Sequence, residues 1–146
     1  MTYIIDSHED LACSALSFNR DYCLSASDIR KSEVGTSYPL WNNGEATLGW
    51  PDYQAGKVAL IFATLFIAPA AYSGGAWDLM AYRTLKEGAQ LWQNQLDYYN
   101  RLANDHPDKS QLVLNPVLLL KHLQDSSGNR TDKETVKSQE KKIFAR

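Results

Sequence analysis

The apolar segment "KVALIFATLFIAP", Lys57 to Pro69, constrains the fold of this chain more than any other feature. Its near-continuous run of aliphatic and aromatic residues is typical of a strand that is covered on both faces, as in a parallel sheet. A core helix is the competing interpretation. The strand is preferred because Gly56 and Pro69 bracket a length that suits a strand. The longest apolar run, residues 58–71, is also too short to cross a bilayer, which needs ~20 residues.

A second strand-like stretch opens the chain. Tyr3, Ile4 and Ile5 are aromatic or β-branched and show no helical period, which predicts a short buried strand. Four ionisable residues stand at its end, namely Asp6, His8, Glu9 and Asp10. The chain therefore delivers a polar cluster at the tip of its first strand.

Helical and loop segments separate and follow the two strands. A helical turn through Arg30 is expected, with Ser25, Ser27 and Asp28 as candidate N-caps. Residues 35–51 are rich in loop-forming residues. The stretch "WPDYQAG" predicts a turn of helix closed by Gly56. Residues 77–104 predict one long amphipathic helix. Its apolar stripe steps by four and three residues, and its members are Leu85, Ala89, Trp92, Leu96, Tyr99 and Ala103.

The end of the chain changes in character. Asn115 and Pro116 are a suitable N-cap and N1 pair for a short helix through Gln124. Residues 126–146 are almost entirely polar and cannot bury enough apolar surface to order themselves. The sequence therefore predicts a βα part over residues 1–125 and a polar, disordered tail over residues 126–146.

The order strand, helix, strand, helix predicts an α/β sheet or barrel with parallel strands. A complete (β/α)₈ TIM barrel needs ~250 residues, so the 146 residues correspond at most to its opening portion.

A net charge of −2 gives no basic field for nucleic acid. No signal peptide is visible, which predicts a cytoplasmic protein. Cys13 and Cys23 lack metal-site or disulfide-framework spacing and are expected to be free thiols, buried or half-buried.

The polar cluster at the first strand suggests a metal site. Because side chains alternate along a strand, His8 and Asp10 should point to one side and Glu9 to the other. An imidazole and a carboxylate are ordinary zinc ligands, and strand ends collect active sites in α/β folds. Asp6 should share the face of His8 and Asp10, behind them. A His-x-Asp pair that merely caps a turn is the plainer alternative.

Three quoted stretches carry a family resemblance. "IDSHEDLACSAL", "FNRDY" and "LGWPDYQAGKVALIFATLFIAP" resemble the membrane dipeptidase (renal dipeptidase-like) family of the amidohydrolase superfamily, over about residues 3–125. The resemblance implies a (β/α)₈ barrel that holds two zinc ions at its strand ends and hydrolyses dipeptides. It also implies that His8 and Asp10 both bind one zinc ion.

The chain departs from the family pattern in the rest of the site. A bridging Glu on the third strand, two later His ligands and a distal Asp have no counterpart, and His106 and His122 are expected to face solvent. Many members of the family have an asparagine at the position that Glu9 occupies in this chain. The chain is therefore expected to be an N-terminal fragment or truncated product of a zinc dipeptidase, inactive alone, and to associate as an oligomer or with a missing C-terminal part. A non-enzymatic remnant or interaction module is one alternative, and another amidohydrolase-type metal hydrolase is the other; "GWPDYQAG" favours the dipeptidase branch.

Overall fold

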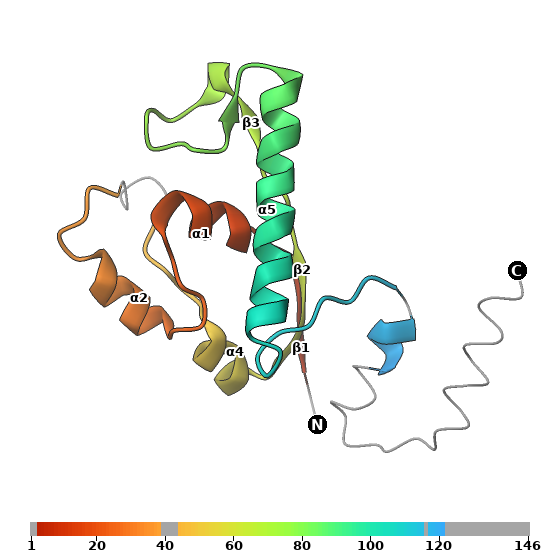
Figure 1. Ribbon diagram of the computed structural model, residues 1–146. Helices are drawn as coiled ribbons and strands as arrows, with labels where there is room; N and C mark the ends of the chain where they lie inside the picture. The colour runs from red at the N-terminus through yellow and green to blue at the C-terminus, as the bar shows by residue number, and fades with distance from the viewer. Residues whose placement is uncertain (1–2, 39–43, 116, 122–146) are drawn as a thin grey trace, which may run out of the picture. The chain divides into compact units, whose positions relative to one another are not determined.

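A computed structural model describes residues 3–38, 44–115 and 117–121 (Figure 1). It divides the chain into one unit of residues 3–110 and a second unit, of which residues 111–115 and 117–121 are described. The domain boundary predicted after residue 125 and the predicted tail both lie outside the described residues.

Two parallel strands form the centre of the first unit. Strand β1 spans Ile4–Glu9 and strand β2 spans Val58–Ala63, with Ile4 paired to Val58 and Glu9 paired to Ala63. The preference for a strand over a core helix is therefore confirmed for Val58–Ala63, but the strand ends well before the predicted bracket at Pro69. The pairing register shifts between Asp6 and Glu9, so the regular alternation of side chains is broken at the tip of β1.

The prediction that both strands are buried is wrong. Ile4 and Ile5 are 52% and 53% exposed, and Phe62 on β2 is 54% exposed. A continuous apolar run is buried only where other elements cover both faces of the sheet. The described part of the chain contains no further strand beside β1 or β2 and no closed barrel. A large part of the apolar sheet surface is thus left open.

Among the described residues between β1 and β2, 10–38 and 44–57, there are three short helices. Helix α1 spans Leu11–Phe18, helix α2 spans Ala26–Glu33 and helix α4 spans Trp50–Gly56. The predicted cap Ser25 accepts a hydrogen bond from the N–H of Asp28, and the predicted turn ending at Gly56 is α4. Both local predictions are confirmed. Cys13 and Cys23 are free and half-buried, as expected.

The long helix is α5, Leu85–Asp105, so the predicted start at residue 77 is wrong. Thr84 and Glu87 form a capping box that fixes its first turn. The preceding residues instead form strand β4, Ala81–Tyr82, which pairs in parallel with strand β3, Ala68–Pro69. A short 3₁₀ helix, η1, follows β3 over Ala70–Tyr72.

The buried face of α5 also differs from the predicted stripe. Gly88, Gln95 and Tyr99 are buried, whereas Trp92 is 52% exposed and Leu96 is 42% exposed. Tyr99 is buried as predicted and belongs to both faces, so the buried face is rotated from the predicted one by less than the ~100° between consecutive residues. Gly88 packs against Ile67 and Tyr82, and a Cβ there would meet a side-chain atom of each at 3.4 Å.

The described part of the second unit is short. Residues 117–121 are helical, and the Asn115 side chain accepts the N–H of Leu118, which agrees with the predicted N-cap. The predicted end of this helix at Gln124 lies outside the described residues. No helix within the part of the chain that the structure describes has the length and apolar character required to cross a bilayer.

Candidate metal centre

The two predicted ligands come from adjoining elements at the tip of β1. His8 lies on β1, and Asp10 follows the strand as the N-cap residue of α1. An N-cap Asp ordinarily accepts a backbone N–H from the first turn of its helix. Asp10 makes no such side-chain bond, with φ −89° and ψ 44°. Its carboxylate is thus free to serve another partner.

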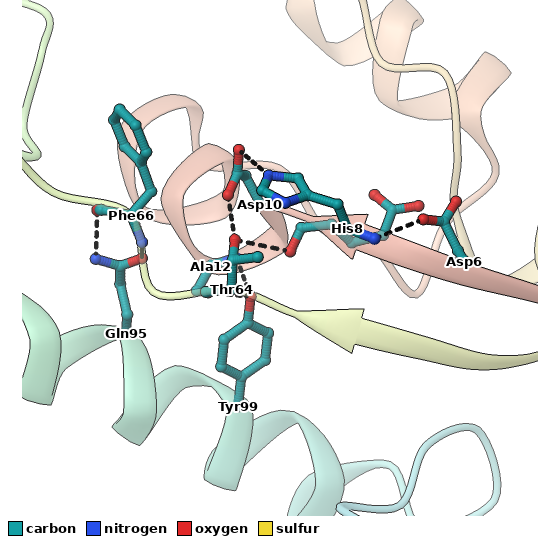
Figure 2. Close-up of polar contacts among 9 residues, drawn as sticks. Asp6, His8, Asp10, Ala12, Thr64, Phe66, Gln95 and Tyr99 are labelled. Atoms are coloured by element: carbon teal, nitrogen blue, oxygen red, sulfur yellow. Dashed lines mark hydrogen bonds and ion pairs between the residues drawn. The ribbon is translucent and has the colours of Figure 1, made fainter.

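The His8 and Asp10 side chains point together, and Figure 2 shows them side by side above the end of β2. His8 Nε2 lies 3.4 Å from Asp10 Oδ2, and the side chains are 70% and 38% exposed. Two donors that share one tetrahedral zinc ion with bonds of about 2.1 Å are separated by about 3.4 Å. The chemistry and the spacing of this pair both fit two neighbouring ligands of zinc, accessible from solvent.

Thr64 and Tyr99 connect the pair to the rest of the fold. The Thr64 hydroxyl contacts Asp10 Oδ1, just after the end of β2, and Tyr99 on α5 donates its hydroxyl to the Thr64 carbonyl at 2.9 Å (Figure 2). The Tyr99 hydroxyl also accepts the N–H of Ala12 at 3.2 Å. Burial raises the pKa of Tyr99 to about 12, so the hydroxyl keeps the proton that it donates.

Glu9 has a hydrogen-bond partner of its own, although it lines the same cleft as His8 and Asp10. The Tyr53 hydroxyl on α4 donates to Glu9 Oε1 at 3.3 Å. The expectation that Asp6 stands behind His8 and Asp10 is not what the side-chain contacts show: Asp6 Oδ1 accepts the backbone N–H of His8 at 3.0 Å. Burial, followed by the negative charge of Asp6, raises the pKa of Glu9 from an ordinary 4.5 to about 7.

This raised pKa predicts a pH-dependent stability. Folded Glu9 keeps its proton to a higher pH than the unfolded chain does, so its stabilising contribution is full below pH 4.5 and is lost as the pH rises through about 7. Glu9→Gln should therefore flatten the decline of the melting temperature between pH 4.5 and 7.5, and should stabilise the chain above pH 7. Both effects are measured by thermal unfolding of the parent and of Glu9→Gln at several pH values across this range, with circular dichroism as the probe and a chelator in the buffer. An unchanged pH profile would contradict the assignment.

A cleft of about 540 Å³ opens beside the pair, lined by the tip of β1, the start of α1 and residues 44–48. Two arginines also line it. Arg20 is neutralised by Glu33 through a buried ion pair of 2.7 Å. Arg30 donates to the carbonyl of Ala46 at 2.5 Å, and no ion pair involves it among the described residues. The cleft is thus lined by the carboxylates of Glu9, Asp10 and Glu45 as well as by the guanidinium of Arg30.

Comparisons of this chain with protein-family models, with curated proteins and with solved structures find no match. Within the described residues, no group of three or more His, Cys, Asp or Glu side chains is arranged to hold a metal ion.

His106 is half-buried at the end of α5, and His122 lies outside the described residues. Burial raises the pKa of Cys13 to about 11, which keeps this neighbouring thiol protonated at neutral pH. The described residues therefore bring together the two predicted ligands, His8 and Asp10.

Sequence reasoning missed Thr64, Gln95 and Tyr99 as partners of this region. Thr64 was visible only as an interruption of an apolar run, although a hydroxyl at the end of a strand is a signal for a polar contact there. Tyr99 was assigned to the helix stripe as a packing group. The role of Gln95 could not be predicted from the sequence, because the helical period does not indicate which glutamine bonds to the backbone of a distant residue such as Phe66.

Proposed function

We propose that this chain supplies the first part of a zinc-dependent dipeptidase, with His8 and Asp10 as two ligands of one zinc ion. The observation that supports this most directly is the 3.4 Å separation of His8 Nε2 and Asp10 Oδ2 at the C-terminal end of a parallel strand. Strand ends of parallel α/β folds are where catalytic groups collect. The resemblance of "IDSHEDLACSAL" and its companion stretches to membrane dipeptidases specifies the reaction class.

The residues of this chain would hold the metal and shape the approach to it. A bound zinc ion supplies an activated water near neutral pH and polarises a carbonyl oxygen. His8 and Asp10 contribute one neutral and one anionic ligand, and their exposure admits an ion and a substrate from the cleft. A catalytic zinc site uses at least three protein ligands, so we propose that further ligands come from other parts of a complete barrel.

The exposed surface of the two-stranded sheet supports this proposal. Ile4, Ile5 and Phe62 leave apolar area open on β1 and β2, which is the area that further strands of a barrel would cover. The chain by itself should therefore bind zinc weakly, lose it on dialysis and hydrolyse no dipeptide. The same exposed surface would make the isolated chain prone to association.

A zinc titration of the full chain tests the metal centre directly. The three histidine imidazoles are followed by ¹H–¹³C correlation spectra, and each is assigned by its own His→Ala variant. Zinc should shift the His8 signals first, and the His106 and His122 signals provide internal controls. Metal content after dialysis and a dipeptide panel are measured in parallel with His8→Ala and Asp10→Ala.

Each result bears on a separate part of the proposal. A zinc-dependent His8 shift that is lost in Asp10→Ala supports a shared ion. An unchanged His8 spectrum would mean that the two side chains form only an ion pair, and would overturn the metal assignment. Stoichiometric zinc that survives dialysis, together with dipeptide turnover abolished by His8→Ala, would show that the chain completes the site without further parts.

A further inference from the structure

Thr64 lies next to Asp10, and all of its polar groups are engaged. Its N–H donates to the Glu9 carbonyl at 3.0 Å, and its carbonyl accepts the Tyr99 hydroxyl at 2.9 Å. Its hydroxyl contacts Asp10 Oδ1 and lies 3.2 Å from the Glu9 carbonyl. Because the backbone of Thr64 is held on both sides, the hydroxyl has a fixed position relative to the tip of β1.

Asp10 needs such a partner to keep its orientation. A carboxylate at an N-cap position has an alternative rotamer in which it accepts N–H groups of its own helix. In this chain Oδ1 is occupied by Thr64 and the helix cap is not made. Oδ2 then faces His8 Nε2. The hydroxyl of Thr64 therefore selects the rotamer in which the two donors converge.

Tyr99 connects this arrangement to α5. It is buried, and its hydroxyl joins the carbonyl of Thr64 to the N–H of Ala12, which is itself fully buried. The end of β2 and the start of α1 are thereby held to one atom of the helix. This fixes the position of Thr64 relative to α1, the helix that Asp10 precedes as its N-cap residue.

We propose that Thr64 is a positioning residue for the metal centre: its hydroxyl holds Asp10 Oδ1 so that Oδ2 is presented beside His8 Nε2, with Tyr99 holding Thr64 in place. The role in metal binding rests on the proposed function, whereas the orientation of Asp10 is a property of the metal-free chain. Hydrogen bonds to metal-ligating carboxylates orient the ligand, and their loss typically weakens metal binding by about 10- to 100-fold.

The test compares Thr64→Val, which keeps the shape and removes the hydroxyl, with Thr64→Ser, which keeps the hydroxyl. The first measurement uses metal-free protein: the three-bond couplings of the Asp10 β-protons report its χ1 rotamer. The parent and Thr64→Ser should show one rotamer, and Thr64→Val should show an average over several. The second measurement is the zinc dissociation constant from the His8 signals, which Thr64→Val should raise about 10-fold or more and Thr64→Ser should leave near the parent value.

The two measurements separate this inference from the proposed function. If zinc shifts His8 in the parent and in Thr64→Val alike, with the same Asp10 couplings, the positioning role is wrong and the metal centre stands. If zinc shifts no His8 signal in the parent, the metal centre is wrong, and averaged Asp10 couplings in the parent would overturn the positioning role as well. Thermal unfolding of each variant must show a cooperative transition; if Thr64→Val does not fold, Thr64→Ala replaces it in both comparisons.

Discussion

Replacing Gln95 with methionine should lower the free energy of unfolding by about 2–4 kcal/mol, since each backbone group left unpaired costs about 1–3 kcal/mol. Gln95 is fully buried in α5, and its side-chain amide pairs with both backbone polar groups of one residue, Phe66, just after β2. Oε1 accepts the N–H of Phe66 at 3.0 Å, and Nε2 donates to the carbonyl of Phe66 at 2.8 Å (Figure 2). Methionine fills a similar volume and makes neither bond.

Gln93→Met is the matched control on the same helix. Gln93 is exposed, and its side-chain amide donates to the carboxylate of Asp97, four residues further along α5. Side-chain pairs at this spacing contribute about 0.2–0.5 kcal/mol. Urea unfolding of the parent and both variants gives the comparison. Equal losses in the two variants would show that the Gln95 amide does not hold the segment after β2.

Arg20→Met should lower the free energy of unfolding by about 3–5 kcal/mol, because it leaves a buried carboxylate without its counter-ion. Arg20 Nε lies 2.7 Å from Glu33 Oε1, and both side chains are almost completely buried. Glu33 Oε2 already has no hydrogen-bond partner within the described residues. Arg20 also donates to the carbonyl of Gly44 at 2.8 Å, which holds one wall of the cleft.

The double variant Arg20→Met/Glu33→Met distinguishes loss of the pair from loss of packing. Replacement of both buried charges by apolar groups of similar size is often close to neutral, so the double variant should recover most of the stability. Lys31→Met breaks the exposed pair with Asp28 and should leave the unfolding curve nearly unchanged. A double variant as unstable as Arg20→Met would mean that the destabilisation comes from packing and not from the isolated charge.

Local chemistry made several elements of the fold predictable. Ser25, Gly56 and Asn115 each carry a turn or cap signal that depends on neighbouring residues alone, and each cap or turn was predicted from it. The same kind of signal, Thr84 with Glu87, marks the start of α5 and was overlooked in favour of the longer period. Burial was less predictable, because the exposure of Ile4 and Phe62 depends on what covers the sheet and not on the strand itself.

The candidate site shows the same division between local and distant information. The convergence of His8 with Asp10 follows from the spacing of two residues near a strand end, and it was expected. Asp6 instead accepts the N–H of His8, at a point where the register between β1 and β2 shifts. The contacts from Thr64 and Tyr99 depend on where α5 lies, and no period or motif within the helix encodes that position.

The hydrogen bond between Tyr99 and Ala12 spans 87 positions of sequence. Closing a chain segment of that length has an entropic cost that must be met before the contact contributes any stability, so contacts of this kind form late in folding. Asp10 is held through Thr64 by the side-chain hydroxyl of Tyr99, which lies far along the chain on α5. In kinetic terms, His8 and Asp10 acquire their relative geometry only after α5 has docked against the end of β2 and the start of α1.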